Sequence, residues 1–125
     1  MSKILLALAL TSIAAFANPS PIDPSVYKRS IRVACVGDSI TQGAKLAKGM
    51  TYPEQLQKML GSAWIVKNFG KSGRTLLKEG DFPYWNESVY QDALQFAPDV
   101  VIIKLGTNDT KPQNWKHIAD FKNDY

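Results

Sequence analysis

The sequence predicts an α/β fold built around a parallel β-sheet. Three apolar segments, rich in β-branched residues, alternate along the chain with three segments of helical character. Such alternation is typical of β-α-β units, in which parallel strands are joined by right-handed helical crossovers. The third apolar segment, residues 100–103, is continuously hydrophobic, which favours a strand buried on both faces of a parallel sheet. We therefore expect one parallel sheet covered by helices.

The composition is that of an ordinary globular protein and excludes several classes of function. Charged residues make up 21% of the 125 positions and hydrophobic residues 45%, which argues against a disordered or fibrous chain. The net charge is only +4 and the basic residues form no long run, so we expect no nucleic-acid binding. A single cysteine excludes an internal disulfide, and no group of Cys and His residues indicates a metal site.

Residues 1–17 have the features of a secretory signal peptide. Lys3 provides a short positive region, residues 4–15 are apolar or small apart from Thr11 and Ser12, and an Ala-Phe-Ala sequence ends at Ala17. Because the apolar run is too short to span a bilayer, we expect cleavage after Ala17, no stable membrane span, and a secreted or periplasmic protein. Residues 18–30 contain three prolines and are expected to form a linker or extended arm.

The first strand is expected at residues 31–36 and ends at Gly37, with Cys35 as an inert thiol of the core. A helix follows, because Thr51 and Glu54 have the spacing of a capping box and Gly61 is typical of a helix end. Its apolar residues recur at helical spacing and predict one buried stripe, made of Leu56, Met59 and Leu60.

The rest of the chain continues the alternation. We expect a short strand at residues 64–67, a loop at 78–85, a helix at 87–96, a strand at 99–105 and a helix from Pro112 that still runs at Tyr125. Three strands make a thin sheet, since doubly wound sheets commonly have about five or six. We therefore expect residues 31–125 to be the N-terminal part of a longer domain, truncated after the third unit, with exposed strand and apolar surface.

Each predicted strand is followed by a loop that contains glycine and polar residues. These loops include Ser39, Gly73 and Asn108, and in a parallel sheet all of them emerge at the same edge. In the flavodoxin-like strand order 2-1-3, the first and third loops flank the point where ligands bind. We therefore expect Ser39 and Asn108 to meet in one crevice, with Gly73 approaching from the other side of the first strand.

The three residue types suit the stabilisation of a developing negative charge. Ser39 on a tight turn exposes its hydroxyl beside free backbone N–H groups, Gly73 allows close backbone approach or a positive φ, and Asn108 offers an uncharged amide donor. Taken singly, each is better explained as a turn or capping residue. Their occurrence at the ends of three successive strands favours a joint role.

The three loop motifs resemble the first three signature blocks of the SGNH, or GDSL-type, hydrolases: VGDSIT at residues 36–41, NFGKSG at 68–73 and LGTND at 105–109. The resemblance implies a serine esterase with a flavodoxin-like three-layer fold and no cofactor. It implies Ser39 as the nucleophile, and an oxyanion hole made by the backbone N–H groups of Ser39 and Gly73 with the Asn108 side chain. The remaining motif residues are expected to support the turns, among them Gly37, Asp38 and Gly106.

One part of the family pattern is missing from the sequence. The fourth block, Asp-x-x-His, supplies the general base and its orienting acid, and the 125 residues contain no such motif. The only histidine is His117, preceded three residues earlier by Asn114. A serine hydroxyl is a weak nucleophile without a base, so His117 is either a substitute base or a surface residue of the last helix.

The substrate indicated by the resemblance is an acetylated carbohydrate. Residues 96–115 are similar to secreted bacterial sialate or acetylxylan esterases, which implies removal of acetyl groups from sugar hydroxyls. Phe82, Tyr84 and Trp85 either stack on a sugar ring or pack within their own loop. Two alternatives stay open: a lipid or lysophospholipid ester as substrate, or an inactive truncated product or carbohydrate-binding relic. Nothing in the sequence indicates an oligomeric state.

Overall fold

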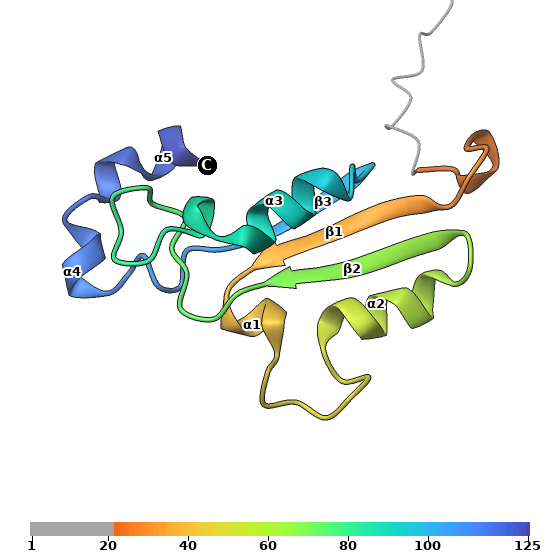
Figure 1. Ribbon diagram of the computed structural model, residues 1–125, viewed down its shortest axis with the longest axis horizontal. Coiled ribbons are helices and arrows are strands. Elements are labelled where there is room, and N and C mark those ends of the chain that lie inside the picture. Colours follow the sequence, from red (N-terminus) through yellow and green to blue (C-terminus); the bar gives the residue numbers. More distant parts are fainter. Residues whose placement is uncertain (1–21) are drawn as a thin grey trace, which may run out of the picture.

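The computed structural model describes residues 22–125, and its centre is a parallel sheet of three strands (Figure 1). β1 (Ile31–Gly37) lies between β2 (Trp64–Gly70) and β3 (Val100–Lys104), so the strand order is β2-β1-β3. Both the parallel α/β class and the 2-1-3 order predicted from the sequence are confirmed. The predicted signal peptide lies outside the described residues, and within residues 22–125 no helix has the length and hydrophobicity needed to cross a membrane.

The helices form layers on both sides of the sheet. α1 (Ser39–Gln42) and α2 (Tyr52–Leu60) lie on one side in Figure 1, and α3 (Ser88–Gln95) lies on the other. On the α3 side the core contains Ala34, Phe69 and Ala93, because alternate residues of a strand point to the same face. Cys35 points to the opposite side, where it is fully buried, as expected for an inert thiol.

Helix α2 begins and ends where the sequence predicts. The Thr51 hydroxyl accepts from the Glu54 N–H, the Glu54 carboxylate accepts from the Thr51 N–H, and Gly61 follows the last residue. The prediction that Met59 is buried is wrong, because its side chain is 83% exposed. The helix turns its Gln57 side toward β2, where the Val66 N–H donates to the side-chain oxygen of Gln57. Met59 projects from the other side of the helix.

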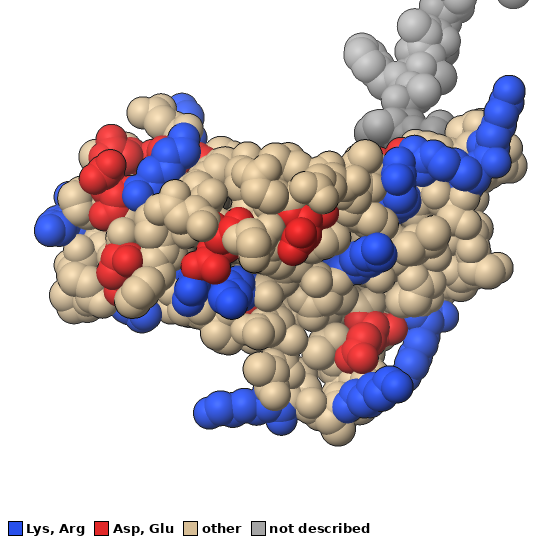
Figure 2. All heavy atoms as spheres, in the orientation of Figure 1, with Lys and Arg blue, Asp and Glu red and all other residues tan. Residues whose placement is uncertain are grey.

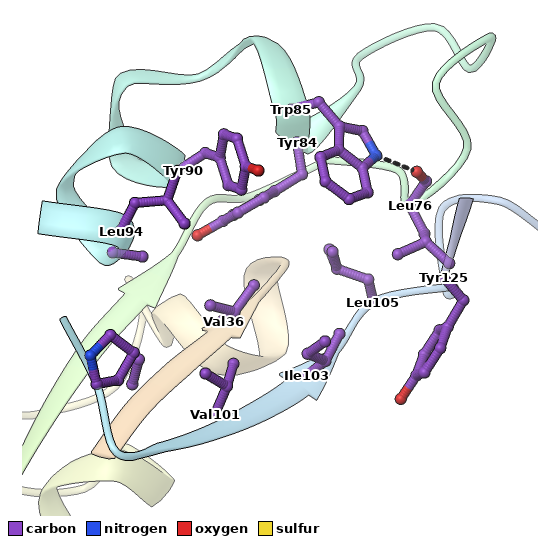
Figure 3. A pocket seen from close by; sticks show the side chains of 13 residues that line it. Val36, Leu76, Tyr84, Trp85, Tyr90, Leu94, Val101, Ile103, Leu105 and Tyr125 are labelled. Atoms are coloured by element: carbon purple, nitrogen blue, oxygen red, sulfur yellow. Dashed lines mark hydrogen bonds between the residues drawn. The ribbon is translucent and has the colours of Figure 1, made fainter. Parts of the chain in front are cut away.

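The burial predicted for β3 is also wrong in part. β3 is an edge strand, and the side chains of Val101 and Ile103 are 50% and 39% exposed. A continuous apolar run shows that a strand has two apolar faces, but not whether anything covers them. Figure 3 shows these two side chains facing a cavity of about 130 Å³, together with Leu94 from α3 and Tyr125. This confirms the expectation of exposed apolar surface beside the strand.

The last segment is not the single helix that the sequence predicts. It consists of three short pieces: α4 (Pro112–Trp115), the 3₁₀ turn η3 (Ile118–Asp120) and α5 (Phe121–Asp124). Side chains tie both ends to the loop after β2, since Asn114 bonds to Asp81 and the Asp124 carboxylate accepts from the Lys78 N–H. These contacts favour a bent segment that follows the loop, and they disfavour one straight helix.

Residues 22–30 of the predicted arm contain a 3₁₀ turn, η1 (Pro24–Val26), and are attached to the sheet by an ion pair. The Arg29 guanidinium donates to both oxygens of Asp99 at 2.7 Å, and the Arg32 N–H donates to the same carboxylate at 2.8 Å. These bonds lower the pKa of Asp99 to about 2. Elsewhere on the face seen in Figure 2, the Lys and Arg side chains are scattered among acidic and uncharged surface.

Candidate active site

The loops that follow the three strands are joined by hydrogen bonds at one edge of the sheet. The Lys71 N–H donates to the Gly37 carbonyl at 2.8 Å, which links the second loop to the first. The Asn108 side chain donates to the Arg74 carbonyl at 3.0 Å, which links the third loop to the second. The predicted site residues Ser39, Gly73 and Asn108 therefore belong to loops that contact one another.

Ser39 is the first residue of α1, directly after β1. Asp38 caps the helix, as expected for a residue that shapes the turn, because its side chain accepts from the Ile40 N–H at 2.9 Å. Gly37 leaves room for the close approach of β3, since a Cβ there would lie 2.7 Å from the Lys104 carbonyl oxygen. Ser39 itself is exposed, and neither its hydroxyl nor its N–H has a hydrogen-bond partner among residues 22–125.

Gly73 lies in the second loop with a φ of +80°, a conformation that glycine adopts without strain. The preceding residue is fixed to α1, because the Ser72 N–H and hydroxyl both donate to the Gln42 side-chain oxygen, at 2.7 and 2.6 Å. Ser72 and Ser39 line the same shallow depression of the surface. The Gly73 N–H has no acceptor in the described part of the chain.

Asn108 is buried at the end of the third loop. One hydrogen of its amide bonds to the Arg74 carbonyl, and its own backbone carbonyl accepts from the Asn114 side chain at 2.9 Å. The second amide hydrogen has no acceptor within the described range. Gly106, which precedes it, has a φ of +116°, so the turn requires a glycine there.

Four residues that hold these loops were not recognised from the sequence as contributors to the site. Gln42 and Arg74 bond to the second loop, Asn114 bonds to the third, and the buried Asp109 carboxylate accepts from the N–H groups of Leu76 and Leu77. Asp109 is the last residue of the LGTND motif, and its place in that motif is the sequence signal from which its role could have been predicted. The others carry no recognisable motif: Gln42 bonds to a residue 30 positions away, and the contacts of Arg74 and Asn114 depend on how the loops fold.

His117 is half-buried and stands directly before η3, outside the helical position predicted for it. Its backbone N–H donates to the Asn114 carbonyl, and no side-chain hydrogen bond joins its imidazole to another described residue. A role for His117 as the base therefore stays a prediction.

The three aromatic residues of the second loop have different surroundings. Tyr84 is buried, its hydroxyl donates to the Phe69 carbonyl at 2.6 Å, and burial raises its pKa. Trp85 is half-buried, and its indole N–H donates to the Leu76 carbonyl at 2.7 Å (Figure 3). Phe82 is 56% exposed and lies against the Arg74 guanidinium. Tyr84 is thus a core residue, whereas the ring of Phe82 is largely exposed.

Comparison with known proteins identifies the family. The GDSL-like lipase/acylhydrolase family matches residues 35–121. An acetylxylan esterase of Xylanibacter ruminicola is 53% identical over 103 residues, which cover 81% of this chain but 22% of that protein. A nonribosomal peptide synthetase of Emericella nidulans is 29% identical over 93 residues, 72% of this chain and 1% of its own length. The chain thus spans about a fifth of the acetylxylan esterase.

Solved structures include esterase AlinE4, described as an SGNH-hydrolase family esterase. It is 27% identical, with a TM-score of 0.47, over 66% of this chain and 43% of that one. The family match is the stronger finding, because it extends over most of the chain and takes in all three loops with Ser39, Gly73 and Asn108. The chain therefore belongs to the GDSL-like lipase/acylhydrolase family.

Proposed function

We propose that this chain carries the nucleophile and the oxyanion-stabilising groups of a serine esterase that removes acetyl groups from carbohydrate. One observation carries the proposal: the Ser39 N–H, the Gly73 N–H and one hydrogen of the Asn108 amide have no acceptor among residues 22–125, although the loops that hold them are bonded together. Donors fixed in this way are what the oxyanion of an acyl-transfer intermediate requires.

In the proposed reaction the Ser39 hydroxyl oxygen attacks the acetyl carbonyl carbon. The carbonyl oxygen gains negative charge and accepts hydrogen bonds from the three donors, which are worth more in the transition state than in the ground state. The bond from the carbonyl carbon to the sugar oxygen then breaks, and the sugar leaves as an alcohol after it takes up a proton. Water attacks the acetyl-enzyme, which releases acetate and restores the Ser39 hydroxyl.

This reaction also needs a base that accepts the Ser39 proton. Removing one member of a catalytic triad typically lowers the rate by several orders of magnitude. His117 supplies the only imidazole of the sequence. Activity of the 125-residue chain therefore depends on whether His117 reaches Ser39, and an inactive product is the competing interpretation.

The acetyl group and the carbohydrate are the finer part of the proposal. They are supported by the 53% identity to an acetylxylan esterase. They are also supported by the exposed ring of Phe82, which packs against Arg74, the residue that follows Gly73. The predicted signal peptide agrees with an extracellular glycan, but agrees equally with a lipid ester.

The test is hydrolysis of p-nitrophenyl acetate by the full chain and by its Ser39→Ala variant. Ser88→Ala is a matched control, because Ser88 is an exposed serine on α3. We expect the Ser39→Ala variant to lose turnover and Ser88→Ala to retain it. Turnover above background that is equal in the wild type and Ser39→Ala, in samples shown to be folded by circular dichroism, would overturn the proposal, and no turnover above background in either would favour the inactive product.

The substrate class is tested with acetylated xylan, measured by acetate release, beside p-nitrophenyl esters of increasing acyl length. We expect Ser39-dependent acetate release from xylan and a preference for the acetyl ester. A preference for long acyl chains with no release of acetate from xylan would favour a lipid ester instead.

A further inference from the structure

We propose that Arg74 is a positioning residue, which fixes the peptide group between Ser72 and Gly73 so that the Gly73 N–H is presented to the oxyanion. The inference deepens the proposed function and rests on it. Its basis is the position of the Arg74 guanidinium, which bonds to the other end of the same peptide group.

The key contact is a hydrogen bond from the Arg74 Nη1 to the Ser72 carbonyl oxygen, at 2.8 Å. That carbonyl and the Gly73 N–H belong to one planar trans peptide, so they point in opposite directions. A guanidinium that holds the carbonyl therefore also sets the direction of the N–H. Because the donor is charged, the bond is stronger than one between neutral groups, and it polarises the peptide so that the N–H becomes a better donor.

This restraint is needed because Gly73 is the residue least able to hold the peptide by itself. Its φ is +80°, and a Cβ placed there would meet no described residue within 4 Å, so no packing at Gly73 itself holds the turn. A turn hydrogen bond from the Arg74 N–H to the Lys71 carbonyl, at 3.4 Å, spans the peptide group without bonding to it. Gln42 does not supply the restraint, since it bonds to the Ser72 N–H and hydroxyl and fixes the preceding peptide group. Among residues 22–125, Arg74 supplies the side chain that bonds to the Ser72–Gly73 peptide itself.

The Arg74 guanidinium is in turn held in place. Its Nε donates to a Glu87 carboxylate oxygen at 2.6 Å, and its Nη2 lies 2.5 Å from the same oxygen. The Phe82 ring lies against the guanidinium, with 5.5 Å between the carbon and the ring centroid. Both charged side chains are only 22% exposed, which makes this pair more rigid than an ordinary surface ion pair.

Arg74 also contacts the second candidate donor. Its backbone carbonyl accepts one hydrogen of the Asn108 amide at 3.0 Å, and the other hydrogen has no acceptor in the part of the chain that the structure describes. One residue thus orients Gly73 through its side chain and Asn108 through its main chain. A side-chain substitution tests the first contact and leaves the second in place.

The kinetic test compares Arg74→Met and Arg74→Lys with the wild type in p-nitrophenyl acetate hydrolysis. Loss of an oxyanion donor typically lowers kcat by about 100-fold to 1000-fold, so a misdirected donor should lower it by at least about tenfold. We expect that fall in kcat for Arg74→Met, with KM changed by less than about threefold, since the contact acts in the transition state. The kcat of Arg74→Lys should lie between those of Arg74→Met and the wild type, because an ammonium group cannot bond to both Glu87 and Ser72 as a planar guanidinium does.

Arg29→Met is the matched control, because it removes another guanidinium bound to a carboxylate, away from the three loops. We expect it to leave kcat within about twofold of the wild type. Millimolar guanidinium added to a small-side-chain variant, Arg74→Ala, should restore part of kcat, which a merely structural role would not explain. Ser39-dependent turnover that is unchanged in Arg74→Met would overturn the inference and leave the proposed function intact.

A second readout needs no turnover. The amide resonance of Gly73 in a nitrogen–proton correlation spectrum reports the hydrogen bond at the Ser72 carbonyl, and we expect it to shift or broaden in Arg74→Met but not in Arg29→Met. An unchanged Gly73 resonance would refute the positioning role whether or not the chain is active. Failure of the proposed function is seen separately, as wild-type turnover that does not depend on Ser39.

Discussion

Replacement of Asp109 by asparagine should destabilise the fold markedly, although the two side chains have nearly the same shape. The Asp109 carboxylate is fully buried and accepts from the Leu77 N–H at 2.7 Å and the Leu76 N–H at 3.1 Å. An asparagine amide offers one acceptor oxygen and turns an NH₂ group toward the other N–H. One hydrogen bond to a charged acceptor is lost and one buried donor is left unpaired.

The expected magnitude follows from these two changes. A hydrogen bond to a charged group is worth about 1.5–3 kcal/mol, and an unpaired buried donor costs about 1–3 kcal/mol. These figures overlap, and the amide is less costly to bury than a carboxylate, so we expect a loss of about 2 kcal/mol in the free energy of unfolding. For a domain of this size that lowers Tm by about 10 °C.

The assay is urea unfolding followed by tryptophan fluorescence, because the Trp85 indole N–H is bonded to the Leu76 carbonyl in the same loop. Asp92→Asn is the control, since Asp92 is exposed on α3 and its substitution should change stability by less than about 0.5 kcal/mol. If Asp109→Asn unfolds at the same urea concentration as Asp92→Asn, the reasoning about the paired N–H groups is refuted.

Three further predictions follow from the packing. Tyr84→Phe should lower the free energy of unfolding by about 1–3 kcal/mol, because the buried Phe69 carbonyl loses its donor; an unchanged urea midpoint would contradict this. Asp99→Asn should destabilise the chain near neutral pH. The pKa of Asp99 is about 2 in the folded chain and its ordinary value is 3.8, so the stability advantage of the wild type over Asp99→Asn should shrink as the pH falls from about 4 to 2. If the urea midpoints of the two proteins differ by a constant amount over that range, the ion pair does not make stability depend on pH. Met59→Ser should leave the urea midpoint nearly unchanged, because the side chain is 83% exposed. A large fall in the midpoint would indicate that Met59 is buried, as the helical spacing predicted.

Much of the fold could be predicted because its signals are local. The strands follow from runs of β-branched residues, and the limits of α2 follow from the spacing of Thr51 and Glu54 and from Gly61. The errors arose where burial depends on what lies opposite. Met59 has the correct helical spacing, but the helix turns another side to β2, and the apolar run of β3 lies at an edge of the sheet.

The sequence by itself determined which residues are candidates for the chemistry. Ser39, Gly73 and Asn108 stand at the ends of three successive strands, and a parallel sheet must bring those ends to one edge. Only the tertiary structure decided which contacts hold the loops that carry them. Arg74 meets Glu87, and Asn108 meets the Arg74 carbonyl, through contacts between segments that no sequence period relates. A hydrogen bond depends on direction as well as distance, and direction is fixed only when the chain has folded.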